Sequence, residues 1–105
     1  MPINYQNYLT PNVTNTSTVY NPTAPGIQAT LLSCILANTS STTAVATVQL
    51  TSGLTTTNII KNVNIPSGSS LNVIDANRLV IIQNNTLTVS SSVTVDVTLS
   101  TVEIT

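Results

Sequence analysis

Histidine, tryptophan and phenylalanine are absent from this chain of 105 residues, and charge is almost absent as well. The charged side chains are Lys61, Asp75, Arg78, Asp96 and Glu103. A serine nucleophile needs a basic partner, and without histidine the remaining candidate is Lys61, which has no Ser-x-x-Lys spacing. The sequence therefore predicts a protein that is not an enzyme.

The same inventory excludes several kinds of ligand site. Three acidic side chains spread over the last third of the chain do not form the local oxygen cluster that calcium needs, and three isolated glycines form no phosphate-binding loop. The net charge is −1, and two basic side chains cannot supply the phosphate contacts of a nucleic-acid-binding protein. We expect no metal, no cofactor and no nucleic acid.

Long hydrophobic runs are also lacking. The longest, Leu31–Ala37, is interrupted by Ser33 and is shorter than the ~20 residues of a membrane helix. We expect a buried strand there and no membrane partner.

Residues 1–8 have neither a basic nor an apolar leader region, so no signal peptide is predicted. Cys34 lies inside the apolar run, which indicates a core position in a reducing compartment.

What the chain does contain is a dense alternation of Thr, Ser and Asn with Val, Ile and Leu, which is typical of β-strands. Turn sequences separate eight such segments: Asn12–Tyr20, Ile27–Asn38, Thr43–Thr51, Thr57–Ile65, Ser70–Ile74, Leu79–Ile82, Leu87–Ser90 and a final strand from Val93. We expect the second and third to pair as a hairpin. This spacing predicts an all-β fold, a single antiparallel β-sandwich that is either Ig-like or a jelly roll.

The final strand has the clearest alternation. Its first odd positions carry valine or leucine, which predicts a buried face that includes Val95 and Val97. The phase then changes, because Val102 and Ile104 occupy even positions. The sequence therefore predicts a β-bulge near Ser100–Thr101.

The few charged residues near these strands have ordinary structural explanations. Asp75 and Arg78 fall in a predicted corner, where a turn-forming aspartate with a nearby arginine is common. Asp96 and Glu103 are expected to face solvent.

The beginning of the chain differs from the rest, since all three tyrosines and four of the five prolines come before Gly26. Proline cannot donate to a sheet ladder, and it lowers the entropy that an extended segment loses on docking. We therefore divide the single domain into an N-terminal arm with the first strand, residues 1–22, and a sandwich body, residues 23–105.

Tyr5, Tyr8 and Pro11 are the candidate interface residues of this arm, because tyrosine is a common interface anchor. For Tyr5 and Tyr8, contact with another subunit and packing within the chain are equal alternatives. Tyr20 is expected to plug the end of its own sandwich. Scarce surface charge indicates a chain that has neighbours, so we expect a homo-oligomer, and among such states a trimer.

Three segments together resemble small virion proteins of tailed bacteriophages, particularly phages of cyanobacteria and other marine bacteria. These segments are Thr18–Pro22, Ile65–Leu71 and Val97–Ile104, and the resemblance covers Thr14 to the end of the chain. The chain departs from the family pattern at Gln83–Thr86, where a Gly-Asp turn is expected, and in its low charge.

The resemblance implies a structural part of the virion, assembled in the host cytoplasm. The first expectation is a capsid decoration (cement) protein that contacts the major capsid protein; the alternative is a neck or tail component that contacts neck or tail proteins. Two other classes remain open. A carbohydrate-binding module would need exposed aromatic side chains, and an adhesin-type module should carry an export signal.

Overall fold

The computed structural model describes residues 3–74 and 78–105 as seven antiparallel β-strands in one curled sheet. The strands are β1 (Ile3–Tyr20), β2 (Gln28–Asn38), β3 (Ala44–Ser52), β4 (Thr55–Ile65), β5 (Ser70–Asn72), β6 (Leu79–Ile82) and β7 (Thr86–Ile104). The described residues contain no helix, and hence no helix able to cross a membrane. The predicted all-β class is confirmed, whereas eight strands in two separate sheets are not observed.

The longest strand, β7, organises the sheet. One edge of β7 pairs with β1 along most of its length, from Ile3 opposite Ile104 to Tyr20 opposite Leu87. Its other edge pairs with β3 in the first half and with β2 in the second half. The two final segments expected from the sequence are therefore one continuous strand, which accounts for seven strands in place of eight.

The prediction that β2 and β3 form a hairpin is wrong, because these two strands do not pair with each other. These strands follow one another along the same edge of β7, β4 pairs with the far side of β3, and β5 and β6 pair with β2. The turn between them is closed by the buried Asn38 amide, which donates to the carbonyls of Thr42 at 2.8 Å and Ile65 at 2.9 Å. Because β7 has 19 residues, it can pair with both strands in turn, and this replaces the local pairing.

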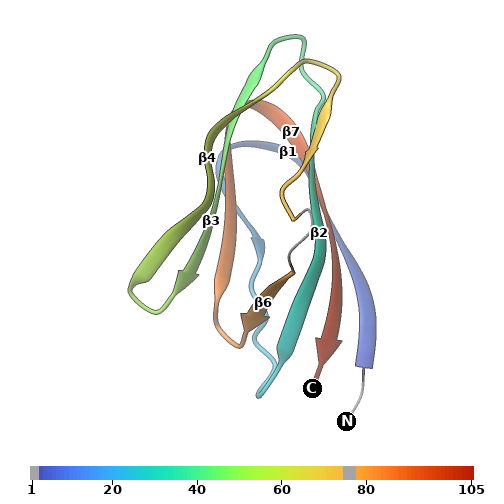
Figure 1. The fold of residues 1–105 in the computed structure, drawn as a ribbon, viewed down its shortest axis with the longest axis vertical. Coiled ribbons are helices and arrows are strands. Elements are labelled where there is room, and N and C mark those ends of the chain that lie inside the picture. The colour runs from blue at the N-terminus through green and yellow to red at the C-terminus, as the bar shows by residue number, and fades with distance from the viewer. Residues whose placement is uncertain (1–2, 75–77) are drawn as a thin grey trace.

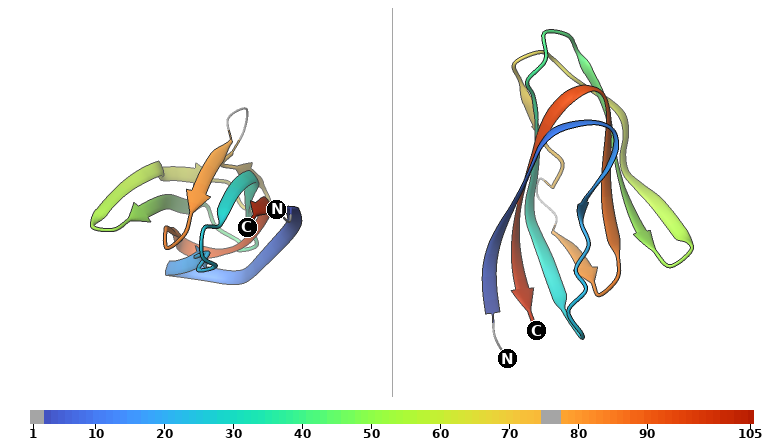
Figure 2. Two further views of the ribbon diagram at one scale, coloured as in Figure 1. Left: turned by 90° about the horizontal axis from the view of Figure 1, so that it is seen from below. Right: turned by 180° about the vertical axis from the view of Figure 1, so that it is seen from behind.

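The sheet is folded over on itself. β1 and β7 run side by side, bend together in an arch and return, so that two halves of the sheet face each other (Figures 1 and 2). The connections that follow β2 and β4 extend beyond this arch (Figures 1 and 2). In β1 the bend coincides with Asn12 and Asn15, whose φ angles of 56° and 57° are left-handed, a conformation that asparagine tolerates. In β7 it lies between Ser91, the last residue paired with β3, and Val95, the first paired with β2.

The core lies between these two halves. Val95 and Val97 are fully buried in it, as predicted. Cys34 is also buried, and burial raises the pKa of its thiol to about 12, so this cysteine is an unreactive core residue. Tyr20 is 5% exposed, which confirms that it fills the end of its own fold.

Two predicted turns are observed where the sequence placed them. Gly68 has a φ of 75° in the turn after β4, and Asn84 has a φ of 68° in the turn before β7. Left-handed backbone of this kind favours glycine and asparagine. The corner predicted at Asp75–Arg78 falls, for its first three residues, outside the described residues.

Candidate functional site

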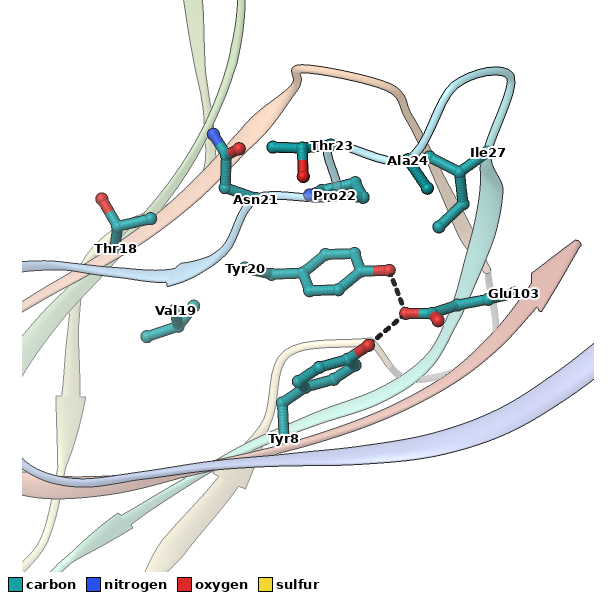
Figure 3. Close-up of a pocket in the computed structure, with 10 residues that line it drawn as sticks. All are labelled: Tyr8, Thr18, Val19, Tyr20, Asn21, Pro22, Thr23, Ala24, Ile27 and Glu103. Carbon is teal, nitrogen blue, oxygen red and sulfur yellow. Dashed lines mark hydrogen bonds between the residues drawn. The ribbon is translucent and has the colours of Figure 1, made fainter. Parts of the chain in front are cut away.

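Tyr8, Tyr20 and Glu103 meet between the two facing halves of the sheet (Figure 3). The Tyr20 hydroxyl donates a hydrogen bond of 2.6 Å to Glu103 Oε2, and the Tyr8 hydroxyl donates to the same oxygen. The two rings lie 4.9 Å apart between centroids and are tilted by 52°. Tyr8 and Tyr20 stand on opposite sides of the β1 bend. These three residues, here named the tyrosine-carboxylate clasp, therefore connect the two halves.

The clasp is a buried polar cluster. Glu103 is 8% exposed, and one of its oxygens is satisfied by two phenol donors. Burial first, and then the hydrogen bond to Glu103, raises the pKa of Tyr8 to about 12 and raises the pKa of Tyr20 above its usual range. Both phenols therefore stay protonated at neutral pH and act as donors to the carboxylate.

The position of Glu103 corrects two predictions, because this side chain faces inward and β7 has no bulge at Ser100–Thr101. Residues 97–104 of β7 pair with β1 without a register shift. The register shift lies on the neighbouring strand β2, between Leu31 and Ser33, directly opposite Thr101 and Ser100. The predicted position of the bulge is therefore correct, and the predicted strand is wrong. The apolar residues move from odd to even positions because the polar side of β7 changes from outward to inward at this point. The backbone of β7 itself continues as a regular strand.

An open pocket of about 410 Å³ adjoins the clasp (Figure 3). It lies between the end of β1 and the loop that leads into β2, and its lining consists of Tyr8, Thr18, Val19, Tyr20, Asn21, Pro22, Thr23, Ala24, Ile27 and Glu103. Hydrogen bonds from Gly26 N to Gln83 Oε1 (3.0 Å) and from Asn84 N to the Pro22 carbonyl (2.8 Å) hold the loop against the turn before β7. The loop thus forms one wall of the pocket, with a mixture of polar and apolar side chains.

Metal-ligating groups are not gathered in the part of the chain that the structure describes. Within residues 3–74 and 78–105, no three cysteine or acidic side chains lie close enough together to hold a metal ion. Asp96 accepts a hydrogen bond of 2.9 Å from the backbone N–H of Asn12, which ties β7 to the bend of β1. Its contact is structural.

The three interface residues predicted from the sequence do not lie together. Tyr8 points inward and belongs to the clasp, so it packs within its own chain. Tyr5 is 77% exposed, and Pro11 is exposed at the bend of β1. Of the two alternatives left open for the tyrosines, internal packing holds for Tyr8, whereas a role of Tyr5 in subunit contact stays a prediction.

Two further exposed residues of β1, Ile3 and Leu9, were not singled out from the sequence. With Tyr5 they occupy odd positions of one strand, so the three side chains point to the same side of the sheet. That spacing was visible in the sequence. Their exposure was not, because it depends on which side of β1 is covered by the rest of the fold.

No protein-family model, curated protein or solved structure matches this chain. The geometry describes a curled antiparallel β-protein with one internal polar clasp and an exposed, uncharged first strand.

Proposed function

We propose that this protein is a non-enzymatic structural component of a phage virion, in which it decorates the capsid. The proposal starts from the sequence resemblance to small virion proteins of tailed phages. One structural observation supports it: β1 is a long edge strand that carries no charge and exposes Tyr5.

The first half of β1, Ile3–Thr10, forms an unprotected edge of the sheet, whereas the second half contains Pro11, the left-handed Asn12 and Asn15, and three register shifts. Among the strands of the described residues, β1 pairs with β7 alone. Its 18 residues include no charged side chain, and Ile3–Thr10 pair with β7 without a register shift. Soluble proteins usually protect such edges with lysine, proline, a bulge or a short strand, because an open edge recruits other chains. An unprotected edge suits a protein whose working state is surrounded by neighbours.

The other edges of the same sheet carry the usual protection. β4 contains Lys61 and the left-handed Asn62, and its pairing with β3 shifts register twice. β5 has three residues and β6 has four. The chain therefore limits pairing at these edges and at the second half of β1, and leaves Ile3–Thr10 open, which favours a specific subunit contact there over general aggregation.

In this proposal the chain forms a closed homo-oligomer, with a trimer as the predicted state, and it contacts the major capsid protein. The alternative location on the same particle is the neck or tail, where the chain would contact neck or tail proteins. We also propose a β-sandwich of Ig-like or jelly-roll type as the fold class, since the two halves of the curled sheet enclose one core. A sugar-binding platform is less favoured, because it would need several exposed rings and Tyr5 is the one largely exposed tyrosine.

Particle analysis tests the proposal. Mass spectrometry of purified virions should find this chain in many copies, and capsid, portal or tail genes should flank its reading frame. Purified chain should also sediment with capsids that lack it. Tyr5→Ala should weaken this binding, whereas Leu54→Ala, which removes a fully exposed side chain from the turn between β3 and β4, should not. Retention on a glycan array without binding to particles would contradict the proposal.

A further inference from the structure

We infer that a second copy of this chain docks on the outer side of the sheet half formed by β1, β7, β2 and β6. The inference rests on the proposed function for its biological setting, and it deepens that function by naming the surface through which copies meet. This surface, here named the outer apolar face, consists of Ile3, Tyr5, Leu9, Ile35, Val80, Ile82, Val102 and Ile104.

The strand register places these residues on one face, because residues directly opposite each other in antiparallel strands point to the same side. One row across the four strands is Tyr5, Val102, Thr30 and Val80. The next row is Ile3, Ile104, Gln28 and Ile82. A third, across three strands, is Leu9, Thr98 and Ile35. Tyr5 with Val102 and Ile3 with Ile104 are direct neighbours, and one polar side chain separates each pair from Val80 or Ile82. A polar row of Asn7, Ser100 and Ser33 lies between these two rows and the third.

The end of β7 supports a contact at this face, where Val102 and Ile104 are half-buried in the single chain. Its inward residues Thr101 and Glu103 are polar, while its outward residues Val102 and Ile104 are apolar. The buried Thr101 hydroxyl has no hydrogen-bond partner among the described residues. A strand that turns apolar side chains outward gains their hydrophobic free energy only when the outer side is covered.

The size of the face fits a second copy. Six of its side chains are between 36% and 77% exposed, which amounts to roughly 600 Å² at about 150–200 Å² for a fully exposed side chain of this size. This area is a sum over side chains that polar residues separate, and the largest contiguous apolar patch on a monomer is usually about 300–600 Å². A stable contact buries about 800 Å² per partner, which this face and its polar rim can supply.

The chemistry of the face also selects a copy of itself as the partner. None of the eight residues is charged, and the one acidic side chain beside them, Asp96, lies at the rim next to Leu9. The face is self-complementary by hydrophobic contact, as a two-fold interface requires, and sheets pack in this way at about 10 Å separation. This contact by itself gives a dimer, so the predicted trimer would need a different, head-to-tail contact.

Charge placed on the face tests the inference. Sedimentation velocity of the wild-type chain up to about 100 µM should show self-association, and Tyr5→Lys and Val80→Lys should each raise the dissociation constant at least about tenfold. Both side chains are exposed in the single chain, so circular dichroism and the melting temperature should stay close to wild type. Leu54→Lys is the matched control, because it adds the same charge at an exposed apolar position far from the face.

Three results would overturn the inference: a wild-type chain that is monomeric throughout this range, association that neither face variant weakens, or a Leu54→Lys effect as large as theirs. A monomeric chain that still binds capsids would preserve the proposed function and remove this surface from it. If the chain self-associates through this face but is absent from virions, the inferred surface is supported and the proposed function is contradicted.

Discussion

Two stretches of β7 share one strand geometry and have opposite polarity. From residue 93 to residue 99, the inward positions carry valine and leucine, and the outward positions are polar. From residue 100 to residue 104, Thr101 and Glu103 face inward and the apolar side chains face outward. The pairing with β1 is unbroken through the change. Alternation therefore shows which residues of a strand share a side. It does not fix which side is apolar, and that side can change along one strand.

The largest expected effect tests the apolar inward side of the first stretch. Val97→Asp should prevent folding, because it places an unpaired carboxylate in a layer where Val97 is 1% exposed. A cost of about 4–5 kcal/mol or more is comparable to the whole stability of a small domain. Circular dichroism should show loss of strand signal and no cooperative unfolding transition.

Thr98→Asp is the matched control on the outward side of the same stretch. Thr98 lies between Leu9 and Ile35 on the outer side of the sheet, so the new carboxylate stays in water and the chain should fold. The same variant should weaken self-association, since it puts charge in the middle of a row of the outer apolar face. If both aspartate variants fold equally well, the inward and outward assignment of β7 is wrong.

Much of the strand content could be predicted from the sequence, but the pairing could not. The alternation in Thr57–Ile65 and Leu79–Ile82 identifies strands that the structure contains with small changes of boundary. Alternation says which residues share a face and nothing about which strand lies beside them. The prediction of a β2–β3 hairpin failed for this reason. β7 is long enough to pair with both strands in turn.

The candidate site shows the same limit for single residues. Burial of Tyr20 could be predicted, because it ends a strand with a large amphipathic side chain. Burial of Glu103 could not, since its hydrogen-bond donors Tyr8 and Tyr20 are 95 and 83 residues away in the chain. A carboxylate is tolerated inside only where the fold brings such donors to it.

The polar inward end of β7 is tested next by removing one donor of the clasp. Tyr20→Phe should lower the free energy of unfolding by roughly 1.5–3 kcal/mol, because a buried hydrogen bond to a charged group is lost. Tyr8→Phe should cost less, since Tyr8 is partly exposed and water can replace its hydroxyl. Urea denaturation of both variants measures the effect. Wild-type midpoints in both would show that the clasp does not hold the two halves together.

The clasp should also make stability depend on alkaline pH. The pKa of Tyr8 rises from 10.0 to about 12 on folding, so between these values the folded chain binds more protons than the unfolded chain. This stabilisation is fully present below pH 10 and is lost as the pH rises through 12. Cys34 contributes with the same sign, as its pKa is also raised to about 12. The difference between wild type and Tyr8→Phe in urea midpoint, measured from pH 9 to pH 12, isolates the tyrosine; a constant difference would contradict the assignment.

The smallest expected effect separates the two polar residues that face inward at the end of β7. Glu103 has its donors, whereas the hydroxyl of Thr101 is buried without a partner among the described residues. Thr101→Val keeps the shape of the side chain and removes that hydroxyl, so it should stabilise the fold by about 1 kcal/mol. The urea midpoint should rise with an unchanged slope, while Thr98→Val on the outward side should leave the midpoint close to wild type. A loss of stability in Thr101→Val would show that this hydroxyl is hydrogen-bonded in solution, and that the inward end of β7 is polar because its polar groups are satisfied.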